Sequence, residues 1–76
     1  MTTVVEIWDN FAEENSYIEK EFDDHKTAIE YVHKDIRKTL KKFGVDKAGI
    51  ENLINNFGLL NKLRVGSHVW LIWNRA

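Results

Sequence analysis

Hydrophobic and polar residues follow two distinct spacings along the chain, and these spacings predict its secondary structure. Residues 3–9 are rich in β-branched and aromatic side chains and lack helical spacing, which is typical of a strand. Residues 16–22 alternate between two faces, so that Tyr17 and Lys20 lie on opposite sides of a second strand. Turn-forming and acidic residues fill positions 10–15 between them, and we therefore predict a β-hairpin.

Two helices are predicted to follow the hairpin. Asp23 or Asp24 is placed to cap the first, which runs to about Phe43 with Gly44 just beyond its end. Asp46 can cap a second, shorter helix, which Gly58 is placed to end. Both helices carry a hydrophobic stripe at helical spacing. The predicted core positions are Ile29, Val32, Ile36, Leu40 and Phe43 in the first helix, and Ile50, Leu53, Ile54 and Phe57 in the second.

The chain ends with a third predicted strand, Ser67 to Asn74, after a turn signal at Gly66. Leu59, Leu60 and Leu63 are expected to keep the preceding segment buried. The order β-β-α-α-β predicts an α+β fold: a single two-layer domain over residues 1–76, with a three-stranded antiparallel sheet and two helices packed on one face. If the last strand pairs with the first, the strands lie in the order 2-1-3.

Two helices can cover only one face of such a sheet, so the other face is a candidate partner-binding surface. A contiguous exposed patch with large aromatic side chains is typical of protein interfaces. The residues predicted for this surface are Trp8, Tyr17, Glu19, Glu21, Trp70 and Ile72. The alternative for the tryptophans is burial in the core or beneath the loop at 10–15.

A second candidate surface is a basic stripe on the first helix. Its residues recur at the spacing of a single helical face and would suit contact with phosphates and bases. The predicted nucleic-acid-binding residues are Tyr31, Lys34, Arg37, Lys38, Lys41 and Lys42. The competing interpretations are a solvated face that supports the helix, and contact with an acidic protein or with the chain's own acidic hairpin.

Composition narrows the class of protein. The 76 residues are 43% hydrophobic and contain no cysteine, so the composition argues against disorder and excludes a disulfide framework. No apolar run reaches the length of a membrane span, and we predict a cytoplasmic protein without membrane contact. The net charge of −1 hides an asymmetry. Residues 1–24 carry eight acids and one base, whereas residues 25–76 carry ten bases and four acids.

No pattern for catalysis, a cofactor or a metal is present. His25 and His33 are eight residues apart on one helix, which separates them by about 12 Å and prevents a shared metal. Ser16 and Ser67 lack a nucleophile context, and the four glycines form no phosphate-binding motif. We therefore predict no catalytic, cofactor-binding or metal-binding residues, and no enzyme.

These patterns favour a small non-enzymatic protein-binding module or stoichiometric inhibitor, whose partner is another protein. One specific version is a viral protein, from a phage or other mobile element, that blocks a host nuclease or defence protein. The first alternative is a nucleic-acid-binding protein that uses the basic stripe. The second is a homodimeric structural domain with no separate activity, built on the uncovered sheet face or by pairing of the last strand.

Overall fold

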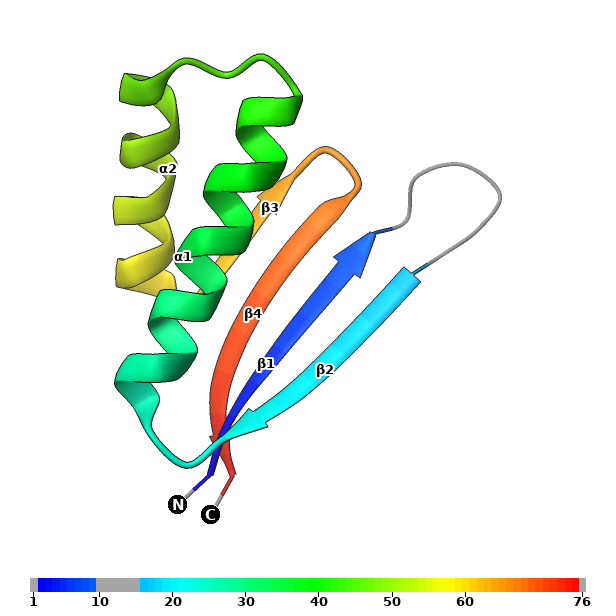
Figure 1. Ribbon diagram of the computed structural model, residues 1–76, viewed down its shortest axis with the longest axis vertical. Coiled ribbons are helices and arrows are strands. Elements are labelled where there is room, and N and C mark those ends of the chain that lie inside the picture. Colours follow the sequence, from blue (N-terminus) through cyan, green and yellow to red (C-terminus); the bar gives the residue numbers. More distant parts are fainter. Residues whose placement is uncertain (1, 10–15, 76) are drawn as a thin grey trace.

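The structure, a computed structural model, describes residues 2–9 and 16–75, which form an α+β fold. The predicted fold class is confirmed, but the sheet has four strands instead of three (Figure 1). The acidic loop predicted at 10–15 lies outside the described residues. The elements are β1 (Thr2–Asp9), β2 (Ser16–Phe22), α1 (His25–Lys42), α2 (Lys47–Leu60), β3 (Lys62–Val65) and β4 (His68–Arg75).

All strands of the sheet pair antiparallel, in the order β2-β1-β4-β3. The first and last strands pair, which is the arrangement under which the order 2-1-3 was expected, and Ile7 lies opposite Trp70 in the β1–β4 ladder. Because β4 has a neighbour on each side, the predicted alternative of a dimer made by pairing the last strand is wrong. The strands at the two edges of the sheet are β2 and β3.

The strand missed by sequence analysis is β3. Its four residues alternate, with Leu63 buried and Lys62 and Arg64 exposed, but so short and charged a run gives a weak strand signal. The two-residue loop Gly66–Ser67 connects it to β4. Gly66 has φ +60°, a conformation that favours glycine and that tight hairpin loops use.

Helix α1 begins and ends where local sequence signals place it. The Asp24 carboxylate accepts hydrogen bonds from the Thr27 hydroxyl at 2.8 Å and from the Lys26 N–H at 3.2 Å, and these lower the Asp24 pKa, the Thr27 bond most. Gly44 follows the helix with φ +83°. Of the predicted stripe, Val32, Ile36 and Leu40 are buried and Ile29 is partly buried against the core. Phe43 is exposed, because the chain leaves the helix at this residue.

Helix α2 extends beyond its predicted end. Asp46 caps it as expected, accepting from the Gly49 N–H at 2.8 Å. However, Gly58 lies inside the helix, and the left-handed residue that ends it is Asn61, with φ +56°. As a result the last helical turn projects Leu59 and Leu60 into solvent, with exposed fractions of 82% and 74%, so their predicted burial is wrong.

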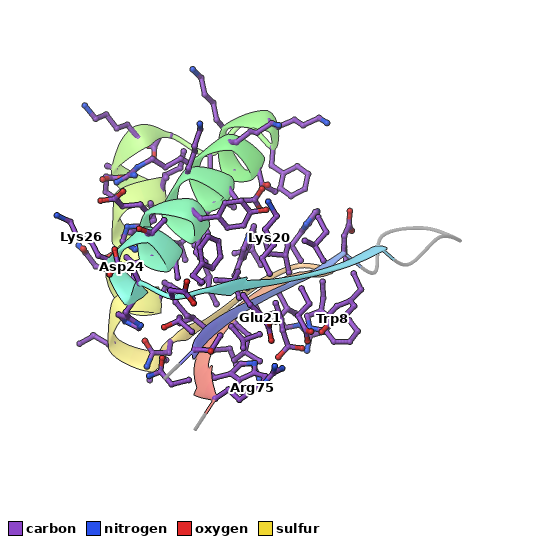
Figure 2. All side chains as sticks on the ribbon, turned by 60° about the horizontal axis from the view of Figure 1, so that its bottom comes forward. Trp8, Lys20, Glu21, Asp24, Lys26 and Arg75 are labelled. Atoms are coloured by element: carbon purple, nitrogen blue, oxygen red, sulfur yellow. The ribbon has the colours of Figure 1, made fainter. Side chains whose placement is uncertain are left out.

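The core lies between the helices and one face of the sheet. The strand register places Val5, Ile7, Leu63, Trp70 and Ile72 on this face, and both helices pack against it. The opposite side, here called the open face, has no helix over it (Figure 2). None of the helices in the described part of the chain has the length and apolar character of a membrane span.

Candidate functional site

Three rows of side chains run across the strands of the open face, and the pair Thr2 and Arg75 lies beyond them. Strand alternation and the antiparallel register determine which residues share a row. Each row is named here by its β1 residue and read from β2 towards β3. The Trp8 row is Tyr17, Trp8, Val69 and Arg64; the Glu6 row is Glu19, Glu6, Leu71 and Lys62; the Val4 row is Glu21, Val4 and Trp73.

Three large aromatic side chains are partly exposed on this face. Trp8 and Tyr17 pack against each other with ring centroids 4.0 Å apart, and the Arg75 guanidinium lies 5.5 Å from the centre of the Trp73 ring. Their exposed fractions are 37% for Trp8, 44% for Tyr17 and 36% for Trp73. The aromatic rings are therefore packed on one side and available to a partner on the other.

The Glu6 carboxylate connects these aromatic residues. Its Oε1 accepts a hydrogen bond from the Tyr17 hydroxyl at 2.9 Å, and its Oε2 accepts one from the Trp73 indole N–H at 2.5 Å. The Tyr17 hydroxyl also lies 2.8 Å from the Glu19 Oε1. Both oxygens of Glu6 thus have partners, and the two rings are held in fixed orientations. Glu6 was not among the residues predicted for this surface, since its role depends on the register of three strands.

This network affects the ionisation of Tyr17. Partial removal from water, followed by the hydrogen bonds to Glu19 and Glu6, raises the pKa of Tyr17 above its ordinary value of about 10. The neutral phenol can donate to these carboxylates, whereas a phenolate would be repelled by them.

We therefore expect a stability loss at high pH that depends on Tyr17. The folded state holds the phenol proton more tightly than the unfolded state, so the stabilisation is complete below about pH 10 and is lost as the pH rises further. In a Tyr31→Phe variant, phenolate absorbance should report the late titration of Tyr17. Urea unfolding of the parent and Tyr17→Phe proteins should show the extra alkaline loss only in the parent; equal losses would contradict the shift.

Charge is distributed unevenly across the open face. The β2 side carries Glu19 and Glu21, whereas the β3 side carries Lys62 and Arg64. Arg75, at the end of β4, pairs with Glu21, and Figure 2 shows both on the side away from the helices. The face therefore has an acidic edge, an aromatic and apolar centre, and a basic edge.

The structure corrects two of the six predicted partner-binding positions. Trp70 and Ile72 are buried on the helix side, with exposed fractions of 0% and 3%, so their predicted place on the open face is wrong. The Trp70 indole N–H donates to the Asp35 carboxylate of α1 at 2.8 Å. The other four positions, Trp8, Tyr17, Glu19 and Glu21, do share the open face. Trp73 and Leu71 take the places expected for the two buried residues.

The residues of the alternative basic surface on α1 differ in their contacts. Lys34, Lys38, Lys41 and Lys42 are exposed, as expected, and Arg37 makes a bidentate pair with Glu51 of α2 at 3.1 and 3.2 Å. This pairing raises the pKa of Arg37 and lowers that of Glu51.

Tyr31, the aromatic member of the same predicted surface, is also engaged. Its ring packs against Phe22 at 5.5 Å, with the Lys20 ammonium 4.8 Å from its centre. A shallow depression of about 280 Å³ lies beside it, lined by Tyr31, Lys34, Asp35 and Lys38. Two of the six predicted residues are thus committed to contacts within the protein.

A further depression of about 400 Å³ lies where α1 meets the ends of β1 and β4. His68 lies there 3.6 Å from the Asp9 carboxylate and packs against Phe43, with ring centroids 5.0 Å apart. Asp35, Lys38 and Lys42 also line it, so acidic and basic groups largely compensate each other. Within residues 2–9 and 16–75, no three histidine or carboxylate side chains gather as a metal site would require.

Comparisons with protein-family models, with curated proteins and with solved structures gave no match.

Proposed function

We propose that this protein acts as a non-enzymatic protein-binding module and that the open face is its binding surface. The observation that supports this most is the gathering of Trp8, Tyr17 and Trp73, all partly exposed, on the one face without helices. Aromatic residues dominate the binding energy of protein interfaces, particularly near their centres. The contacts with Glu6 and between the rings orient these side chains before binding, which lowers the entropy cost of association.

The carboxylates on this face favour a protein over a nucleic acid. Exposed aromatic rings on a sheet can stack on bases, but such surfaces also need positive charge to hold the phosphates. Here Glu6, Glu19 and Glu21 lie among and beside the rings. A phosphate backbone would be repelled from the β2 side, whereas a protein with apolar and basic side chains would complement it.

That the protein is an inhibitor, and that it has a viral origin, stay predictions, as does nucleic-acid binding through α1. In the basic stripe, Arg37 is paired with Glu51, and the Tyr31 ring packs against Phe22 and the Lys20 ammonium. These contacts within the protein make the stripe the weaker candidate surface.

The proposal is tested by affinity capture with surface variants of the full chain. Trp8→Ala and Trp73→Ala remove exposed ring area from the open face, and Lys38→Ala with Lys41→Ala serves as the matched control on α1. Proteins captured by the parent and the control, but lost with the tryptophan variants, are then purified and titrated directly. We expect each tryptophan change to weaken binding at least about tenfold.

The folded state of each variant is checked by circular dichroism before capture. Partners lost only with the lysine variants would instead place the binding surface on α1. Capture that is the same for every folded variant would contradict the proposal.

A further inference from the structure

The distribution of charge on the open face makes that face complementary to itself. The Glu6 row begins with Glu19 on β2 and ends with Lys62 on β3, and the Trp8 row begins with Tyr17 and ends with Arg64. Reversing the order of the strands therefore exchanges acidic or aromatic positions for basic ones. A second copy can present this reversed order if it lies face to face with the first.

We propose that the partner on the open face is a second copy of this chain, related by a two-fold axis that runs parallel to the strands. This inference rests on the proposed function, because it names the occupant of the same surface. Such an axis lies between the two sheets and places β2 of one copy over β3 of the other, and β1 over β4. The interface is then isologous, as in most homodimers.

The strand register gives the contacts that this axis brings together. In the Glu6 row, Glu19 faces Lys62 of the second copy; in the Trp8 row, Tyr17 faces Arg64, which allows a cation–π contact. In the centre, Trp8 faces Val69. An in-plane axis perpendicular to the strands would instead place β2 over β2, so that the glutamates of both copies meet. The charges thus favour the axis that runs parallel to the strands. Because twisted sheets pack at about 30° to each other, the strands of the two copies would be aligned to within about that angle.

The centre of the face is suited to burial. Its one charged group is Glu6, and hydrogen bonds from Tyr17 and Trp73 already occupy both carboxylate oxygens. These bonds offset part of the cost of removing Glu6 from water. Leu71 and Val69 complete an apolar centre. Arg75, at the end of β4, is paired with Glu21, and the other charges lie on the two edge strands. This arrangement matches the apolar core and polar rim of protein interfaces.

The size of the face sets the expected strength. The Trp8 and Glu6 rows cross four strands and the Val4 row crosses three, so the face spans at most roughly 20 Å by 20 Å, or about 400 Å² of flat area per copy. A standard interface buries about 800 Å² per partner, so we expect a weak dimer that exchanges with monomer at micromolar concentrations or above.

The test is sedimentation equilibrium of the full chain from about 5 to about 500 μM at low ionic strength, where association should become visible. The mean mass should rise from 9.0 kDa towards twice that value. Glu19→Lys places a lysine opposite Lys62 of the second copy, and Lys62→Glu places a glutamate opposite Glu19. Each single change should weaken the dimer at least about tenfold, since it juxtaposes like charges.

The double variant Glu19→Lys with Lys62→Glu restores both opposite-charge pairs and should recover the parent dissociation constant to within about threefold. It still lacks the Tyr17 contact with Glu19, so recovery cannot come from that hydrogen bond. An exchange on the helix surface, Glu30→Lys with Lys34→Glu, is the matched control and should leave dimerisation unchanged.

Three results would overturn the inference: a monomer at every concentration, a dimer that neither single change weakens, and single changes whose effects the double variant does not reverse. The first leaves the capture experiment open, because a different protein could then occupy the open face. If the protein dimerises as expected but every folded variant captures the same proteins, the result would count against a separate partner and not against self-association.

Discussion

Replacing Trp70 with alanine is expected to lower the free energy of unfolding by about 3–5 kcal/mol, the usual cost of truncating a large buried aromatic side chain. Trp70 is completely buried on the helix side of β4, and its ring stacks on His68 with centroids 5.8 Å apart. The change also removes the hydrogen bond from the indole N–H to Asp35. Since a chain of this length has a stability of roughly 4–11 kcal/mol, the variant should lie close to unfolding.

The matched control is Trp73→Ala, three residues further along the same strand. Trp73 is on the open face, 36% exposed, and donates to Glu6. Its replacement should cost only about 1–2 kcal/mol, from partial loss of contact area and one hydrogen bond. Urea unfolding followed by circular dichroism measures both values. Equal losses in the free energy of unfolding, or a greater loss for Trp73→Ala, would mean that the buried and exposed sides of β4 are assigned the wrong way round.

Residues close in sequence determine the features that sequence analysis predicted correctly. Asp24 and Asp46 cap their helices through N–H groups two and three residues away, and Gly44 takes the left-handed conformation just beyond α1. The buried stripe of α1, with Ile36 at its centre, also follows from spacing alone. Phe43 fits the same spacing but is exposed, because helical periodicity does not show where the chain turns away from the core.

Which side of β4 points towards the helices could be determined only with information from other strands. Alternation correctly separates Trp70 from Trp73, but both faces of β4 are apolar and either could point towards the helices. The choice depends on the register with β1, where Trp70 stands beside Ile7 and Trp73 beside Val4. The strand β3 was missed for a similar reason, since it becomes recognisable only through its pairing with β4.

The candidate site was predictable where a single strand defines it. Tyr17, Glu19 and Glu21 share a face because they alternate along β2, and no other strand is needed to show this. The position of Glu6 between Tyr17 and Trp73 requires the register of β2, β1 and β4 together. The most connected residue of the surface was therefore the one that local patterns could not identify.

The end of α2 supports a second large prediction. Phe57→Ala should lower the free energy of unfolding by about 3–5 kcal/mol, because the ring is completely buried between the helices and the sheet. Leu59→Ala and Leu60→Ala, two and three residues further on, should each cost less than about 0.5 kcal/mol beyond small differences in helix propensity. Side-chain hydropathy alone would predict similar losses of stability at the three positions. Denaturant unfolding of the three variants therefore shows whether burial, and not hydropathy, determines the loss.

His33 provides an independent readout of the same packing. Its ring lies edge-on to Phe57 with centroids 6.1 Å apart, and burial, together with the nearby charge of Arg37, lowers its pKa. Removing the Phe57 ring should admit water to this position and move the His33 pKa back towards its ordinary value. NMR titration of the His33 ring protons, in whatever fraction of the variant remains folded, measures this change. Leu59→Ala should leave the titration unaltered, and a parallel shift in that variant would show that the end of α2 packs differently.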